Sequence, residues 1–154
     1  MDDLSRFLPI SGRARVDESA VHRDIAPELR RVLMALLSAH VDPAVLDALA
    51  ERLAPGEGDA RGRLVRIIDS TKHRRPAELG EVVLAAIDAG LPVDADITGF
   101  VVLHRTAQAP AAIRRALSNR TLVASDAGWR IGRGAEVVAP AADLVRLVYG
   151  RPLP

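Results

Sequence analysis

The stretch Thr121–Pro152, TLVASDAGWRIGRGAEVVAPAADLVRLVYGRP, holds the only tryptophan and the only tyrosine of the chain, together with its densest turn signals. Leu122–Ser125 is a short apolar run, Asp126-Ala127-Gly128 is a turn signal, and an alternating pattern resumes at Trp129. Alternating runs separated by such a turn are typical of paired strands. The stretch therefore predicts a β-hairpin.

The second half of the stretch predicts a third strand and a helix. Gly132 and Gly134 permit a bulge or a sharp bend, and residues 136–138 can form a short strand after it. Pro140 suits the first residue of a helix, and Gly150 suits the position just past its end. The apolar residues at helix spacing are Leu144, Val145, Leu147 and Val148.

Trp129 is expected to be the packing centre of this β-β-β-α module. We predict that its ring lies on the inner face of the hairpin, against the helix that contains Leu144 and Val148. The alternative is an exposed ring that serves as a stacking platform for a ligand.

The order L-V-A-x-D-x-x-W-x-x-G-x-G-x-E-V-x-x-P-A-x-x-L-x5-G-R-P resembles the C-terminal segment of the mycothiol-dependent maleylpyruvate isomerase family. The resemblance covers about a fifth of the chain and implies a DinB-like helical bundle ahead of the module, with a divalent metal held by two histidines and a carboxylate. The matching residues are Leu122, Val123, Ala124, Asp126, Trp129, Gly132, Gly134, Glu136, Val137, Pro140, Ala141, Leu144, Gly150, Arg151 and Pro152.

Helix signals recur ahead of the module. Start signals, each followed by apolar residues at helix spacing, lie at Pro27, Asp42-Pro43, Asp59, Pro76 and Pro110. The first of these helices would bury Leu29, Val32, Leu33, Leu36 and Leu37, with Met34 and Ala35 widening the buried face.

The segment between Gly90 and Leu103 is ambiguous. Residues 91–99 read as an extended loop in which Asp94 and Asp96 are paired acids, either flanking a site or simply solvated. The apolar run Phe100–Leu103, FVVL, fits a buried strand and a buried helical turn equally well.

These elements predict an α+β fold, with an N-terminal bundle of four or five helices followed by a small three-strand plus helix module. We divide the chain into an arm at residues 1–16, a helical region at 17–98 and the small module at 99–154, which together could form one compact domain. A short helix is also expected from Asp17 to Asp24.

Composition indicates a soluble, cytoplasmic protein. The chain has 154 residues and no cysteine, which excludes disulfides, thiolate metal sites and cysteine nucleophiles and fits a reducing compartment. No apolar run approaches the ~20 residues of a membrane span, and the start MDDLSRFLPI lacks the order of a secretion signal.

Charge is distributed unevenly along the chain. Residues 101–154 hold 8 arginines and lysines against 3 acids, whereas residues 1–100 hold 13 against 17. The C-terminal excess indicates either an anionic partner or ordinary surface arginines. The candidate anion contacts are Arg114, Arg115, Arg120 and Arg133.

A metal site and a catalytic site both lack a complete residue set. His40, at the end of the first predicted helix, and Glu78, at the start of another, are the candidate ligands that the resemblance implies, but Val82 stands where a second histidine would share the face of Glu78. His22, His73 and His104 fall on no matching helix face. No glycine-rich phosphate loop or nucleophile elbow occurs. We expect no bound metal, no cofactor and no catalytic residue.

Three functions remain as hypotheses. The first, which we favour, is a non-catalytic binding or protein-interaction domain with an unknown protein partner or a second copy of the chain. The second is a mycothiol-dependent, metal-using isomerase or transferase. The third, less expected, is a nucleic-acid binder of winged-helix type, in which residues 110–119 form the recognition helix and the Asp126 hairpin forms the wing.

Overall fold

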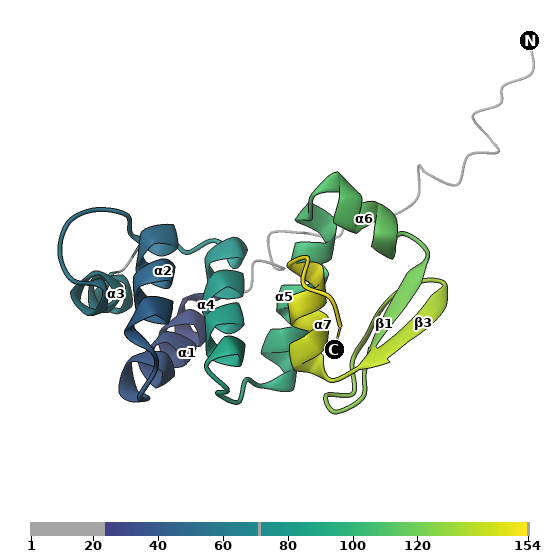
Figure 1. Ribbon diagram of the computed structural model, residues 1–154, viewed down its shortest axis with the longest axis horizontal. Helices are drawn as coiled ribbons and strands as arrows, with labels where there is room; N and C mark the ends of the chain where they lie inside the picture. The colour runs from purple at the N-terminus through teal and green to yellow at the C-terminus, as the bar shows by residue number, and fades with distance from the viewer. Residues whose placement is uncertain (1–23, 71, 154) are drawn as a thin grey trace, which may run out of the picture.

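The computed structural model describes residues 24–70 and 72–153 and confirms the α+β fold class. The predicted arm at residues 1–16 and nearly all of the short helix expected at 17–24 lie outside the described residues. Figure 1 shows the N-terminal helices gathered at one end, two helices in the middle and the sheet at the other end.

The described residues form seven helices, of which the last is separated from the others by the three strands. None of these helices is long and apolar enough to cross a membrane. They are α1 (Ala26–Ser38), α2 (Pro43–Leu53), α3 (Ala60–Asp69), α4 (Pro76–Asp88), α5 (Ala95–Gln108), α6 (Ala111–Leu117) and α7 (Ala141–Val148).

The helix starts follow the predicted capping chemistry. The side chain of Asp42 accepts a hydrogen bond from the backbone N–H of Ala44 (2.9 Å) at the start of α2, and that of Asp59 accepts one from Gly62 (2.8 Å) at the start of α3. Each carboxylate satisfies an N–H group that has no partner inside its helix.

The buried face of α1 is narrower than expected. Leu29, Val32, Leu33, Leu36 and Leu37 are buried as predicted. The prediction that Met34 and Ala35 widen this face is wrong, because both are exposed, Met34 to 55%. Both residues belong to the exposed part of α1, so only a narrow stripe of α1 meets the core.

α4 is the central helix of the molecule. It packs against α1 and α2 on one side and against α5 and α7 on the other. A helix enclosed on several sides must be apolar over most of its surface. The buried residues of α4 are accordingly Leu79, Gly80, Val82, Val83, Leu84, Ala85, Ala86 and Ile87.

α5 resolves the segment that the sequence left ambiguous. Phe100–Leu103 is helical, and the expected loop at residues 91–99 ends at Asp94, because Asp94 is the N-cap of α5 and Asp96 lies in its first turn. The predicted boundary between residues 98 and 99 falls inside this continuous helix.

The C-terminal module contains the predicted hairpin and third strand. β1 (Arg120–Ala124) pairs with β2 (Arg130–Gly132) in antiparallel fashion and with β3 (Ala135–Ala139) in parallel fashion, so the strand order is β2-β1-β3. Gly132 and Gly134 have positive φ angles of 104° and 116°, and the backbone carbonyls of Arg120 and Asn119 leave no room for a Cβ at either position. The tight return from β2 to β3 therefore requires glycine at both positions.

The sheet packs on the helices through one face. Side chains alternate between the two faces of a strand, and the inward side chains of β1, Leu122 and Ala124, are buried. α7 covers β1 and α5 contacts β2, and both helices lie on the same side of the sheet in Figure 1. On the outward side, Val138 is 60% exposed.

Candidate binding surfaces

Of the two residues considered as metal ligands, Glu78 is engaged at the start of α4. His40 is exposed just after α1. Glu78 lies in the first turn of α4, where its carboxylate accepts a hydrogen bond from the backbone N–H of Arg75 (2.8 Å) and lies 3.7 Å from the guanidinium of Arg74. Among residues 24–70 and 72–153, no group of three or more histidine, aspartate or glutamate side chains is placed to hold a metal ion.

Two of the other histidines, His73 and His104, lie in the described residues. His73 is exposed in the loop before α4, and His22 lies outside the described residues. His104 lies on α5, where its ring stacks on Phe100 with 6.3 Å between centroids and bonds to the amide of Gln108 (3.1 Å). Burial, and then the charge of Arg105, lower the pKa of His104, which favours its neutral form.

Trp129 packs on α5, a helix that the sequence did not pair with it. Its indole N–H donates to the hydroxyl of Thr98 (3.1 Å), and a Cβ at Gly99 would lie only 3.1 Å from its Cδ1 atom. The ring thus packs on α5 over a glycine and is half-buried. The sequence predicts that the second strand begins at Trp129, and in the structure β2 begins one residue later, at Arg130.

The ring of Trp129 forms one wall of a shallow groove between α5 and the hairpin. The groove has a volume of about 420 Å³. Its helical wall is a single face of α5, because residues four apart on a helix lie one above the other. The lining residues are Ala95, Asp96, Gly99, Phe100, Leu103, Ala127, Gly128, Trp129 and Ile131.

The groove combines exposed apolar surface with one acid. Leu103 is 59% exposed although it is a large apolar residue on a helix of the core. Asp96 is exposed at the N-terminal end of the groove and makes no ion pair with any described residue, whereas neighbouring Asp94 pairs with Arg31 of α1 (2.5 Å). The groove is therefore apolar along its length and negative at one end.

A second surface is defined by the arginines of the C-terminal module. Arg105 lies over the ring of Tyr149, 4.5 Å from its centroid, and Arg130 pairs with Glu136 across the outer face of the sheet. Arg151 binds both carboxylate oxygens of Asp88 at 2.7 Å.

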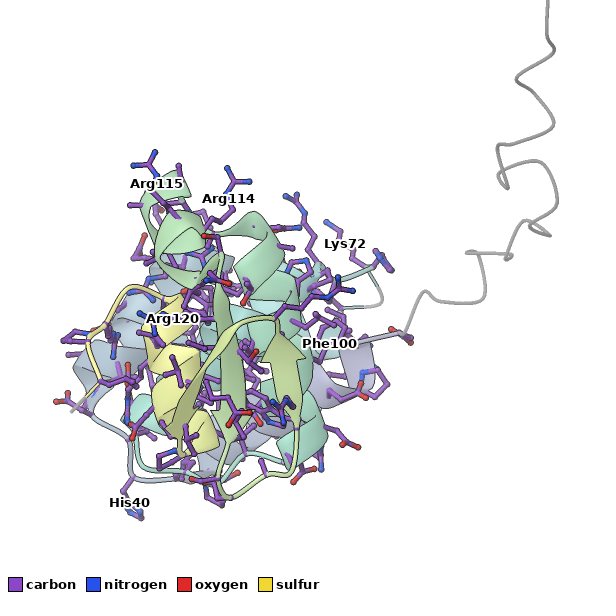
Figure 2. All side chains as sticks on the ribbon, turned by 90° about the vertical axis from the view of Figure 1, so that its right-hand side faces the viewer. His40, Lys72, Phe100, Arg114, Arg115 and Arg120 are labelled. Carbon is purple, nitrogen blue, oxygen red and sulfur yellow. The ribbon has the colours of Figure 1, made fainter. Side chains whose placement is uncertain are left out.

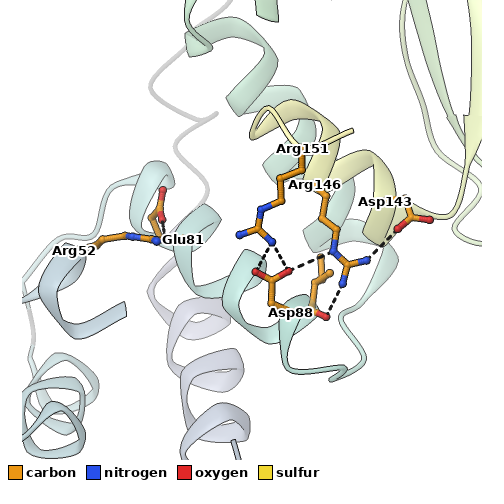
Figure 3. Close-up of polar contacts among 7 residues, drawn as sticks. Arg52, Glu81, Asp88, Asp143, Arg146 and Arg151 are labelled. Carbon is orange, nitrogen blue, oxygen red and sulfur yellow. Dashed lines mark hydrogen bonds and ion pairs between the residues drawn. The ribbon is translucent and has the colours of Figure 1, made fainter. Parts of the chain in front are cut away.

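Arg146 ties α7 to the end of α4. It bridges Asp88 (3.3 Å) and Asp143 (3.0 Å), and it also donates to the carbonyl of Ile87 (3.1 Å). Figure 3 shows Arg146 and Arg151 converging on Asp88. These two arginines serve the packing of the two helices against each other.

The four arginines named as candidate anion contacts are the arginines of the C-terminal module that have no partner among the described residues. Arg114, Arg115, Arg120 and Arg133 are exposed and make no side-chain hydrogen bond or ion pair with any residue that the structure describes. Figure 2 shows Arg114 and Arg115 projecting from α6 at one end of the molecule, with Arg120 below them. His40 lies at the opposite end of the same view.

Tyr149 is a packing residue that the sequence reasoning missed. It follows α7, and a Cβ at Gly80 of α4 would collide with its hydroxyl oxygen. Burial, and then the negative charge of Glu81, raise the pKa of Tyr149 to about 12 against the opposing charges of Arg105 and Arg52. A glycine inside a helix, away from any turn, was the available signal, because such a glycine often marks close packing.

Comparison with known proteins leaves the chain without an assigned family. The resemblance of Thr121–Pro152 to the maleylpyruvate isomerase family consequently stays a prediction. The chain matches no protein-family model, and neither the curated proteins nor the solved structures yielded a significant match.

Proposed function

We propose that this protein is a non-catalytic protein-interaction domain and that the groove between α5 and the hairpin is its binding site. The observation that carries the proposal is the pairing of a fixed aromatic ring with an exposed leucine. Trp129 is held on α5 by Thr98 and Gly99, and Leu103 beside it is 59% exposed. Rigid aromatic side chains next to exposed apolar ones are the usual anchors of protein interfaces.

The groove favours a short apolar peptide segment as its occupant. From Ala95 to Leu103 the helical wall rises about 12 Å, which is the length of roughly four residues of extended chain. The lining side chains are mostly apolar, so the segment should be apolar as well. Asp96 at one end favours a lysine or arginine in the flanking position of the partner.

A site of this size supports transient binding. A volume of about 420 Å³ is near the lower end of the range for small-ligand sites, and few side chains can be buried in it. The entropy lost on association offsets most of the energy gained from so small an area. We therefore expect a Kd on the order of micromolar.

The proposal is tested by selecting peptides that bind the full chain from a random display library. Each selected peptide is then titrated against the full chain. Trp129 is the only tryptophan, so its emission reports occupancy of the groove without a label. The selected peptides are expected to share apolar residues followed or preceded by a basic residue, and to shift the emission of Trp129 on binding. Selected peptides without an apolar consensus, or peptides that bind without changing the emission of Trp129, would contradict the proposal.

A further inference from the structure

We infer that the edge of the molecule formed by α6, the start of β1 and the β2–β3 turn binds the phosphate backbone of a nucleic-acid duplex. This inference is independent of the groove, because it uses none of the groove residues. The four arginines without partners, Arg114, Arg115, Arg120 and Arg133, carry it.

The C-terminal part of the chain has few acidic residues, and each of them already has a partner. Residues 97–125 contain no aspartate or glutamate. Asp126 accepts a hydrogen bond from the backbone N–H of Ala141 (2.8 Å), Glu136 pairs with Arg130, and Asp143 pairs with Arg146. The positive charge at this edge is therefore not neutralised within the described part of the chain.

The fold brings the four arginines to the same edge. α6 turns Ile113 and Leu117 toward the molecule, which leaves Arg114 and Arg115 on its outer side. Arg120 follows α6 as the first residue of β1.

The β2–β3 turn adds the fourth arginine. Ala135 donates its backbone N–H to the carbonyl of Asn119 (3.2 Å), and the hydroxyl of Thr121 donates to the carbonyl of Gly134 (3.1 Å). These bonds hold Arg133, the residue before Gly134, next to the segment that joins α6 to β1.

The chemistry of this edge fits phosphates better than an acidic protein. A guanidinium binds two phosphate oxygens at once, and serine and asparagine side chains, here Ser118 and Asn119, commonly add contacts to the sugar-phosphate backbone. A protein interface would need a buried aromatic or aliphatic anchor, whereas the other exposed residues of α6 are Ala111, Ala112 and Ala116.

A duplex is favoured over a single strand for a related reason. Single-strand binding relies on aromatic side chains that stack with unpaired bases. The chain has only four aromatic residues, namely Phe7, Phe100, Trp129 and Tyr149, and none of them lies on α6 or on the β2–β3 turn. Charge without stacking predicts backbone contacts that are insensitive to sequence.

The test is a titration of the full chain against a fluorescently labelled DNA duplex, followed by anisotropy at several salt concentrations. Four phosphate contacts predict that log K falls with log salt with a slope of about 3 to 4. Arg114→Gln, Arg115→Gln and Arg120→Gln should each weaken binding about three- to tenfold and reduce the slope by about 1. The matched control is Arg66→Gln, since Arg66 is exposed on α3 and pairs with no described residue; this variant should bind as the unmodified chain does.

Three results would overturn the inference. The first is no binding at low salt, and the second is an equal loss in the Arg66→Gln control. The third is that polyglutamate or single-stranded DNA, at the same concentration of charge, competes as strongly as the duplex itself. The edge would then recognise negative charge without the geometry of a duplex.

Discussion

Trp129 shows how one residue can support both the fold and the proposed binding site. Its ring is half-buried on α5, with the indole N–H bonded to Thr98, which itself donates to the carbonyl of Ala95 (2.8 Å). Thr98 is 2% exposed and its hydroxyl is fixed by Ala95, so the indole N–H has this acceptor in only one position of the ring. An unpaired buried polar group is costly, and this favours one fixed position of the ring.

Replacing Trp129 by phenylalanine and Thr98 by valine tests this bond. Each single change should lower the free energy of unfolding, and a double-mutant cycle should give a coupling of about 1 kcal/mol, the usual net value of such a bond. Urea denaturation followed by circular dichroism measures all four proteins without relying on tryptophan emission. Strictly additive effects would show that the bond does not form.

Gly80 and Tyr149 form a second residue pair that can be tested. Alanine inside a helix is normally favoured over glycine by ~0.5–1 kcal/mol. In this chain Gly80→Ala should instead destabilise, because its Cβ collides with the Tyr149 hydroxyl. In a Tyr149→Phe background the nearest remaining ring atom, Cζ, lies at an ordinary 3.5 Å, so the same change should stabilise. An identical effect of Gly80→Ala in both backgrounds, measured by denaturation, would contradict this packing.

The pKa of Tyr149 predicts how stability changes in alkali. A phenol has an unfolded pKa of ~10, and the folded value is raised to about 12. The unfolded state therefore loses its proton first, so the contribution of this group is complete below pH ~10 and is lost as pH rises toward about 12. Since Tyr149 is the only tyrosine, the phenolate absorbance of the folded chain reports it directly. A midpoint at the ordinary value would show that the hydroxyl is solvated.

At the scale of elements, α7 is held against α4 by polar bonds as well as by apolar packing. Asp88 at the end of α4 forms ion pairs with Arg146 and Arg151, and Arg146 also donates a hydrogen bond to the carbonyl of Ile87. A carboxylate shared by two guanidiniums loses less entropy per bond than separate exposed pairs do, and each bond is assisted by charge.

Asp88→Asn should lower the free energy of unfolding by ~1–2 kcal/mol, because it weakens both arginine contacts at a partly buried site. Glu136→Gln is the matched control: it breaks an ion pair whose side chains are 62% and 48% exposed, and should change stability by less than ~0.5 kcal/mol. Denaturation measures the free energy of unfolding of both variants. Equal small effects would mean that α7 is held by its apolar face alone.

The elements that could be predicted are those with a local cause. Asp42 and Asp59 cap helices because their carboxylates reach the first free N–H groups, and such spacing is visible in sequence. Gly132 and Gly134 mark the tight return of the sheet for an equally local reason, their positive φ angles.

The start of α5 could not be predicted, because its cause is not local. Gly99 lies in the middle of α5 and weakens its helical signal, yet it is there to accommodate the ring of Trp129, which is 30 positions later in the chain. The apolar run after Gly99 has no helical or strand period of its own. Only the contact between α5 and the hairpin explains both features.

At the scale of the whole molecule, the fold class followed from element order, whereas the binding surfaces depended on how the elements pack. The sequence named Arg114, Arg115, Arg120 and Arg133 by charge alone, and the structure shows which arginines are already paired. The groove was not predicted, because α5 was not identified as one helix and Trp129 was assigned to α7. Both surfaces belong to the C-terminal part of the molecule and to its junction with the helical bundle.

The most direct test of the proposed function compares two exposed apolar residues. Leu103 lies in the groove and Met34 lies on α1 outside it, and their exposed fractions are 59% and 55%. For a peptide selected on the unmodified chain, calorimetric titration should show that Leu103→Lys weakens binding at least about tenfold, since burying one leucine contributes ~1.5–3 kcal/mol. Met34→Lys should change the Kd less than about twofold. Equal losses in the two variants, or no loss with Leu103→Lys, would contradict the assignment of the groove as the binding site.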